Sequence, residues 1–284
     1  MNRECTLLIL AGGKGVRMEM LGHLSSKASL VTYNQPLLVR ILEQAREAGL
    51  HKVLISTSPS LHESLKNLLS AYSNYSLKSL DQVSLISNEA HEKGPIEALQ
   101  QALCYIKTDR CIICLGDMFF IRNPFGEITQ KIDESSNYLG VASVVFQEEL
   151  RCGGLVCDKD GLITEIIEKP IDTVKNAFRW TGIALVNSCI FEDIRNIEAR
   201  TLHNYAVGDL FECHRNQGYS YRSVLTSDFV NINSPRHLFL ASCYAVIEEH
   251  RHNIELCSGL ATIALQLRVN VLKSQIDFQA TFRS

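Results

Sequence analysis

Residues Leu7–Met18 read LLILAGGKGVRM, and the interpretation of the whole chain begins from this stretch. Its apolar residues lead into an Ala-Gly-Gly turn at 11–13, which predicts a short buried strand ending in a turn without obstructing side chains. The backbone N–H groups of such a turn can face an anion, and Lys14 and Arg17 place two cations beside it. The stretch therefore predicts a binding site for a polyphosphate.

Two better-known phosphate loops do not fit this stretch. The Walker loop needs a Gly four residues before a Gly-Lys-Ser/Thr run, whereas here Gly15 follows Lys14 and the upstream position is Leu8. The dinucleotide-binding fingerprint needs a third Gly where this chain has Met18, and no acidic residue follows at the expected distance. An ordinary glycine-rich connection between a strand and a helix remains the alternative.

The composition is typical of a soluble globular protein. Of 284 residues, 46% are hydrophobic and 21% charged, and the net charge of -3 gives no basic field for nucleic acid. The ten cysteines show no repeated spacing and no secretory signal precedes Leu7, so we expect reduced thiols in a cytoplasmic protein. Cys111 and Cys114 have CxxC spacing, but positions three apart face opposite sides of a strand, which argues against a shared metal. The apolar stretch at 256–272 is interrupted by polar residues, so no membrane span is expected.

The first half of the chain alternates short apolar strands with helices. Further strands are predicted at 53–56, 83–86 and 111–115. Pro36 and Gly49 favour the start and end of one helix, Ser60 and Glu63 form a candidate capping box for a second, and Gly94-Pro95 begins a third. This alternation predicts an α/β fold with a doubly wound, mostly parallel sheet. Ligands of such a sheet gather at the carboxyl ends of its strands, where both the glycine turn and Asp117 fall.

The second half is β-rich. A strand is predicted at 139–146, a hairpin around the turn at 158–161, and another strand at 181–186, while the chain is predicted to be helical from Pro235. We therefore expect a domain at 1–245, divided into a nucleotide-binding half at 1–125 and a half for a second substrate at 126–245. A C-terminal helical extension follows at 246–284, and the sequence leaves open whether it makes a homo-oligomer.

Three charged residues are candidates for binding a metal ion or a phosphate: Asp117, Lys27 and Lys169. Asp117 follows Gly116 at the end of an apolar strand, where a carboxylate can hold Mg²⁺ against a phosphate if another oxygen ligand joins it. Asp is also common in this position as an ordinary turn or cap residue. Lys27 and Lys169 are candidate phosphate clamps, although a single Lys is usually solvated surface.

The order of these motifs resembles the sugar-phosphate nucleotidyltransferases, or NDP-sugar pyrophosphorylases, which have a glycosyltransferase-A-like α/β fold. The resemblance covers roughly Thr6 to Ala245, and the order and spacing of its motifs are more specific than any single one. It rests on LAGGKGVRM at 10–18, SKASLVTYNQPLL at 26–38, KGPIEAL at 93–99, LGD at 115–117, EKP at 168–170, TGIALV at 181–186 and FVNINSPRHL at 229–238.

The resemblance implies that a nucleoside triphosphate and a sugar 1-phosphate react to give an NDP-sugar and pyrophosphate. Arg17 would hold the departing phosphates, Lys27 the α-phosphate or the sugar phosphate, and Asp117 with Asn231 would bind Mg²⁺. The implied nucleotide-binding residues are Leu10, Ala11, Gly12, Gly13, Gly15, Glu89 and Gly94. Those implied for the sugar phosphate are Gly154, Glu168, Lys169, Thr181 and Gly182.

Three positions depart from the family pattern. Ser26 replaces the usual Pro before Lys27, which predicts a less rigid loop. Asn231 replaces a frequent Asp, so its amide oxygen would bring no charge to the metal. Glu89 replaces a frequent Gln at the base-reading position, and a carboxylate acceptor would favour guanine or cytosine, although a one-residue slip would put Asn88 there.

An active nucleotidyltransferase is the leading hypothesis for the function. A second hypothesis is a cytidylyl- or guanylyltransferase for another phosphorylated small molecule. A third is a non-catalytic relative that binds nucleotide or NDP-sugar as a regulatory subunit, which Asn231 and Ser26 motivate.

Overall fold

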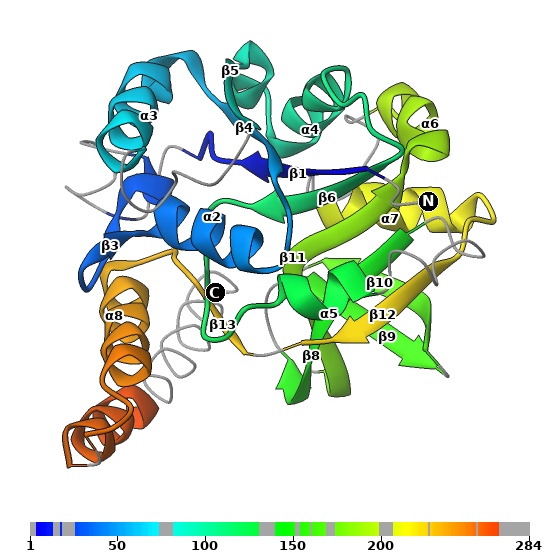
Figure 1. Ribbon diagram of the computed structural model, residues 1–284. Helices are drawn as coiled ribbons and strands as arrows, with labels where there is room; N and C mark the ends of the chain where they lie inside the picture. The colour runs from blue at the N-terminus through cyan, green and yellow to red at the C-terminus, as the bar shows by residue number, and fades with distance from the viewer. Residues whose placement is uncertain are drawn as a thin grey trace, which may run out of the picture.

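A nine-stranded mixed sheet forms the centre of the computed structural model (Figure 1). The structure describes residues 4–13, 18, 26–73, 82–130, 140–150, 154–159, 161–168, 174–198, 207–226, 228–253 and 255–266. Within these, only the backbone is described at 140–150, 154–159, 167–168 and 174–177. The strand order is β5-β4-β1-β6-β11-β8-β12-β10-β9.

The first four strands of this order pair in parallel, as the alternating pattern predicts. Their Val-, Ile- and Leu-rich sequences suit strands that are covered on both faces. They are β1 (Cys5–Leu10), β4 (Lys52–Thr57), β5 (Gln82–Ser87) and β6 (Arg110–Leu115).

The remaining strands join the sheet mainly by antiparallel pairing, so the second half is β-rich as expected. The predicted hairpin is present, and its strands pair from Lys159 with Leu162 to Gly154 with Glu168. The strands are β8 (Gly140–Leu150), β9 (Gly154–Lys159), β10 (Leu162–Glu168), β11 (Val174–Asn187) and β12 (Tyr221–Leu225). Two short pairs lie outside the sheet: β2 (Val31–Thr32) with β3 (Gln35–Pro36), and β7 (Met118–Phe120) with β13 (Phe229–Asn231).

Helices cover both faces of the sheet and bury two hydrophobic clusters, which makes the sheet doubly wound (Figure 1). One cluster packs against α2 (Leu37–Glu47), α3 (Pro59–Tyr72), α5 (Phe125–Gln130) and α8 (Pro235–Glu249). The other packs against α4 (Pro95–Leu103), α6 (Phe191–Asn196) and α7 (Val207–Asn216). Cys111 lies in the second cluster and Cys114 in the first, so the two thiols face opposite sides of β6 as predicted.

Two helix starts differ from the sequence prediction. Ser60 and Glu63 lie inside α3, which begins at Pro59 after Ser58, so the predicted capping box is wrong. Pro59 explains the earlier start, because its fixed φ suits the first turn of a helix. Similarly, Pro36 is the N-cap of α2 and not its first helical residue.

The C-terminal part is helical, as predicted from Pro235 onward. After α8, residues 255–266 form a further helix. Helix α8 continues across residue 245, and the division of the chain at 125 and 245 stays a prediction. Among the described residues, no helix is both long and apolar enough to cross a membrane.

Buried His214 on α7 predicts a loss of stability in acid. Its Nδ1 lies 2.6 Å from the hydroxyl of Tyr221, its ring stacks on Tyr219, and burial lowers its pKa against the opposing influence of Asp193. In the unfolded chain this histidine has a pKa of about 6.5, so as the pH falls through that value the unfolded state binds more protons than the folded state. The contribution of His214 to the free energy of unfolding is therefore fully present above about pH 6.5 and is lost as the pH falls below it.

We expect the midpoint of urea unfolding to fall between pH 7.5 and pH 5.5, and to fall less in the variant His214→Gln. Burial shifts the pKa of His91 in the same direction and lowers that of His237 to about 4, so part of the dependence should remain. Exposed His51, changed to Gln, is the control and should leave the pH dependence intact. An unchanged pH dependence in His214→Gln would contradict the assignment.

Candidate active site

A cavity of about 280 Å³ opens at the carboxyl ends of β1 and β6. The chain leaves β1 toward β4 on one side and later returns to β6 on the other, so the order of strands reverses between β1 and β6. Ligands of α/β sheets bind at such a switch point. The cavity is lined by Leu10, Ala11, Gly12, Gly13, Ser26, Lys27, Ala28, His91, Pro95, Leu115, Gly116 and Asp117.

The backbone at the strand ends forms the floor of the cavity. Leu10 pairs with Leu115 in the parallel register, and the N–H of Gly116 donates to the carbonyl of Leu10 at 2.9 Å. A Cβ atom at Gly116 would lie 2.9 Å from that carbonyl oxygen and 3.1 Å from Cα of Ala11. The glycine at this position is therefore what allows the two strand ends to lie close together.

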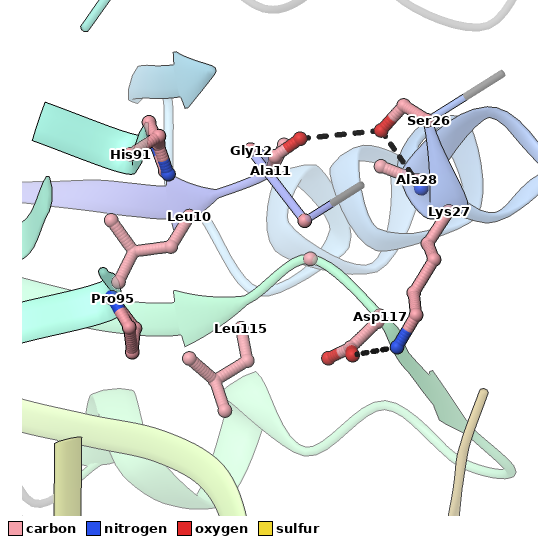
Figure 2. Close-up of a pocket in the computed structure, with 12 residues that line it drawn as sticks. Leu10, Ala11, Gly12, Ser26, Lys27, Ala28, His91, Pro95, Leu115 and Asp117 are labelled. Carbon is pink, nitrogen blue, oxygen red and sulfur yellow. Dashed lines mark hydrogen bonds and ion pairs between the residues drawn. The ribbon is translucent and has the colours of Figure 1, made fainter. Parts of the chain in front are cut away.

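Lys27 and Asp117 form an ion pair at one end of the cavity (Figure 2). The ammonium of Lys27 lies 2.9 Å from Oδ2 of Asp117, and both side chains are mostly buried, with exposed fractions of 14% and 27%. Lys27 begins the short 3-10 helix η2 (Lys27–Ser29). The two residues predicted from separate motifs therefore meet in one site.

Ser26 fixes the start of η2. Its side-chain oxygen accepts from the N–H of Ala28 at 3.2 Å, and its hydroxyl donates to the carbonyl of Ala11 at 3.2 Å. The side chain is fully buried. These bonds tie the loop to the glycine turn, so they replace the restraint that a Pro would supply and counter the expectation of a looser loop.

Asn233, which the sequence reasoning missed, completes this polar cluster. Its Oδ1 accepts from the ammonium of Lys27 at 2.7 Å, and its Nδ2 donates to Oδ1 of Asn231 at 2.7 Å. Pairing of β7 with β13 brings this segment to the site, and the N–H of Ile232 donates to the carbonyl of Asp117 at 2.8 Å. The alternation of Asn231 and Asn233 around an apolar residue is the signal that could have identified it.

His237 lies beside this cluster without adding positive charge to it. The N–H of Asn233 donates to Nδ1 of His237 at 3.1 Å. Burial, with the nearby charges of Arg179 and Lys27, lowers the pKa of His237 to about 4. The imidazole is therefore neutral near pH 7, and Lys27 is the cation that faces Asp117.

The oxygen donors of the cluster fit Mg²⁺. Asp117 offers a carboxylate, and Asn231 and Asn233 offer amide oxygens, which are the hard ligands that Mg²⁺ takes. In the described part of the chain, no group of three or more His, Cys, Asp or Glu side chains could hold an ion. Such a donor set suits an ion that takes its other ligands from phosphates and water.

The other end of the cavity is apolar except for His91, and it lies away from Lys27 and Asp117 (Figure 2). His91 belongs to η3 (Glu89–Glu92), and Pro95 begins α4 after Gly94, whose φ of 154° favours glycine. Glu89 is exposed and does not line the cavity. His91, which the sequence reasoning did not select, occupies the position at the cavity instead.

Several predicted site residues lie elsewhere or cannot be placed. Gly15, Arg17 and Lys169 fall outside the described residues. Gly154 and Glu168 are backbone partners at one end of the β9–β10 hairpin, away from the cavity lining.

Thr181 and Gly182 lie where the register of β11 against β8 shifts, between Trp180 and Ala184. Thr181 is fully buried, and the φ of +81° at Gly182 favours glycine there. Neither residue lines the cavity, so the sugar-phosphate roles of all these residues stay predictions.

Gly12→Ala should destabilise the protein through His91. A Cβ atom at Gly12 would overlap the imidazole ring of His91 far inside van der Waals contact, so the ring must move. Overpacking of this kind costs about 1–3 kcal/mol, measurable as a lower urea midpoint. The double variant Gly12→Ala/His91→Ala should recover most of the loss, and a strictly additive double variant would show that the clash is relieved elsewhere.

Comparison with known proteins gives a consistent result. The family model of the MobA-like NTP transferase domain matches residues 7–147. A bifunctional sugar-1-phosphate nucleotidylyltransferase/acetyltransferase from Sulfurisphaera tokodaii is 28% identical over 64% of this chain and 41% of its own length. A glucose-1-phosphate thymidylyltransferase from Mycolicibacterium smegmatis is 24% identical over 74% of this chain and 71% of its own. The chain thus spans about half the length of some curated relatives that it matches.

The fold also matches solved structures. A structure of UDP-glucose pyrophosphorylase complexed with UDP-glucose aligns with a TM-score of 0.71 at 18% identity. The alignment covers 87% of this chain and all of that chain. This likeness confirms the predicted fold of the nucleotide-diphospho-sugar transferases.

Proposed function

We propose that this protein condenses a nucleoside triphosphate with a sugar 1-phosphate, because the family model of the MobA-like NTP transferase domain matches residues 7–147. An oxygen of the sugar phosphate attacks the α-phosphorus in line, the bond from that phosphorus to the bridging oxygen of the β-phosphate breaks, and pyrophosphate leaves. The products are an NDP-sugar and pyrophosphate. The observation that carries this proposal is the ion pair of Lys27 and Asp117 at one end of a glycine-floored cavity.

The residues of the cavity have separate roles in this reaction. The turn at Gly12 and Gly13 receives the phosphates, and the ammonium of Lys27 neutralises negative charge near the α-phosphorus. Asp117 and Asn231 hold Mg²⁺, and Asn233 keeps Lys27 in place. Bound Mg²⁺ stabilises the negative charge of the phosphates. The reaction needs no covalent enzyme intermediate, so alignment and charge neutralisation account for the catalysis.

The second half of the chain supplies the sugar-phosphate side of the site in this proposal. Lys169 holds the sugar phosphate, whereas Arg17, in the nucleotide-binding half, holds the departing β- and γ-phosphates. Gly154, Glu168, Thr181 and Gly182 line the sugar pocket. Relatives that are named for sugar 1-phosphates support this class of second substrate.

Pyrophosphate release tests the proposal directly. We expect release when the protein is incubated with Mg²⁺, one of five nucleoside triphosphates (ATP, GTP, CTP, UTP and dTTP) and glucose 1-phosphate or mannose 1-phosphate. EDTA should abolish it. Nucleotide binding without release from any pair would contradict a transferase of this class and would identify a regulatory nucleotide-binding protein instead.

Asn231→Asp should remain active. The new carboxylate still accepts from Nδ2 of Asn233, as Oδ1 of Asn231 does at 2.7 Å, and it adds a charged ligand for the metal. A Mg²⁺ titration of pyrophosphate release should therefore reach half-maximal rate at a lower Mg²⁺ concentration than in the unmodified protein. Asn231→Leu is the control, because it removes the side-chain oxygen that would bind the metal. This variant should reach half-maximal rate only at a higher Mg²⁺ concentration. Complete inactivity of Asn231→Asp would show that the amide has another role.

A further inference from the structure

The strand order places a further charged residue at the edge of the sheet where the cavity opens. Strand β11 lies beside β6 and runs antiparallel to it, and Ile183 of β11 pairs with Cys114 of β6 (Figure 1). Residues 174–181 of β11 therefore extend past the carboxyl end of β6, where Asp117 lies. Arg179 is four residues before Ile183, so it lies on this extension.

The side chain of Arg179 is directed toward β13, the strand that carries part of the polar cluster. Its neighbour Trp180 is buried in the second hydrophobic cluster, so Arg179 is on the opposite face of the sheet. There its guanidinium carbon lies 4.5 Å from the centroid of the Phe229 ring. Phe229 and Asn231 are alternate residues of β13, so their side chains share one side of the strand. Asn231 therefore lies about 7 Å further along the side that the guanidinium contacts.

Arg179 and Lys27 are close to the same imidazole. The ammonium of Lys27 donates to Oδ1 of Asn233, and the N–H of Asn233 donates to Nδ1 of His237 at 3.1 Å. Burial, followed by the charges of Arg179 and Lys27, lowers the pKa of His237 to about 4, so this side chain is neutral. Counted with Arg179, the polar cluster carries two positive charges against the one negative charge of Asp117. Such an excess of positive charge favours an anion.

The position of Arg179 across the sheet indicates which anion it meets. Strands β1, β6 and β11 are consecutive in the sheet, and the glycine turn follows β1 whereas Asp117 follows β6. In the proposed function the triphosphate occupies the glycine turn, so Arg179 on β11 lies on the far side of Asp117 from the nucleotide. The anion that this side receives is therefore the phosphate of the second substrate, which must approach the α-phosphorus opposite the leaving pyrophosphate.

We propose that Arg179 is a substrate-binding residue that holds the phosphate group of the sugar 1-phosphate, alongside Lys169. This inference rests on the proposed function, because it requires a phosphorylated second substrate beside the nucleotide. A guanidinium has five N–H donors in one plane, so it can bind a phosphate through two of them while others contact the protein. The contact with Phe229 restricts the guanidinium before the substrate arrives, which reduces the entropy lost on binding.

Steady-state kinetics of pyrophosphate release separate the two substrates. With the most active pair of triphosphate and sugar 1-phosphate, Arg179→Met should raise the KM for the sugar 1-phosphate by about 10–100-fold, because a charged hydrogen-bonding partner is lost. The KM for the triphosphate should stay the same. Arg179→Gln removes the charge with a different side chain and should give a similar rise, whereas Arg179→Lys keeps the charge without the planar fork and should give a smaller one. Arg251→Met is the control on an exposed arginine that pairs with Glu248, and it should leave both KM values unchanged.

Binding without turnover is a second readout. A triphosphate in which carbon replaces the oxygen between the α- and β-phosphorus can bind but cannot release pyrophosphate. Calorimetric titration of the sugar 1-phosphate into the complex of the protein, Mg²⁺ and this analogue should show the same 10–100-fold loss of affinity, again about the value of one charged contact, in Arg179→Met and in Arg179→Gln.

The outcomes distinguish this inference from the proposed function. A lower thermal unfolding midpoint with unchanged affinity for the sugar 1-phosphate would show that Arg179 only covers Phe229, and would overturn the inference. A rise confined to the KM for the triphosphate would overturn it too, because it would place Arg179 on the leaving phosphates. Both results leave the proposed function intact. Failure of the unmodified protein to release pyrophosphate from any pair would overturn both.

Discussion

Asp117→Ala should lower the rate of pyrophosphate release by about 10²–10³, the usual loss when one electrostatic contact to a reacting group is removed. The carboxylate is the charged oxygen ligand proposed for Mg²⁺, and the amide oxygens of Asn231 and Asn233 bring no net charge to replace it. The fold should persist, because Lys27 retains its 2.7 Å bond to Asn233 and the carbonyl of residue 117 still accepts from Ile232.

A matched control for this variant lies at the other end of the same strand. Asp109 is exposed and immediately precedes β6, whereas Asp117 follows it, so Asp109→Ala should leave the rate unchanged. Asp117→Asn separates charge from shape and should be nearly as slow as the Ala variant. Near-normal release by Asp117→Ala, measured with saturating Mg²⁺, would place the metal site elsewhere.

Lys27→Met should lower kcat/KM by a similar factor of about 10²–10³, because the cation faces developing charge in a partly buried site. Its ammonium contacts Asp117 at 2.9 Å and Asn233 at 2.7 Å, so the position of the charge is fixed before a substrate arrives. Met keeps much of the length and the apolar stem of the side chain. Lys27→Arg should recover only part of the rate, since a planar guanidinium does not match an ammonium in this geometry.

Lys52 is the control for this second variant. It forms an ion pair with Glu4 at the amino end of β4, away from the cavity, so Lys52→Met should have normal kinetics. The thermal unfolding midpoint of each variant separates a loss of chemistry from a loss of fold. Unchanged kcat/KM in Lys27→Met, with an intact fold, would remove Lys27 from the reaction.

The sequence predicts the parts of the site that depend on local patterns. A glycine turn after an apolar strand and an Asp after another apolar strand identify two strand ends, and the rules for parallel sheets bring those ends together. The strands themselves follow from runs of β-branched and aliphatic residues. The helix starts at Leu37 and Pro59, which follow the N-caps Pro36 and Ser58, were harder to predict, because a Pro can sit at or beside an N-cap and the alternatives differ by one or two residues.

The remaining parts depend on contacts that no local pattern encodes. The alternation of Asn231 and Asn233 indicates that Asn233 shares a side of the chain with Asn231, but not what it contacts. Asn233 reaches Lys27 only through the pairing of β7 with β13, which the sequence does not indicate. His91 lies three residues before Gly94 and is one of several polar residues in its segment. Its proximity to Gly12 becomes apparent only when η3 is placed beside the end of β1, so the sequence favoured Glu89 instead.

The contact between Lys27 and Asn233 also has a consequence for how the protein is made, since it joins residues that are 206 positions apart. A ribosome adds about 5–20 residues per second, so about 10–40 s separate the synthesis of its two partners. Contacts of such sequence separation form late in folding, because a long loop must be closed first. We therefore expect the parallel half of the sheet to form on the nascent chain while its ammonium still lacks the amide oxygen. Binding of nucleotide at full affinity would then begin only after residue 233 has been added.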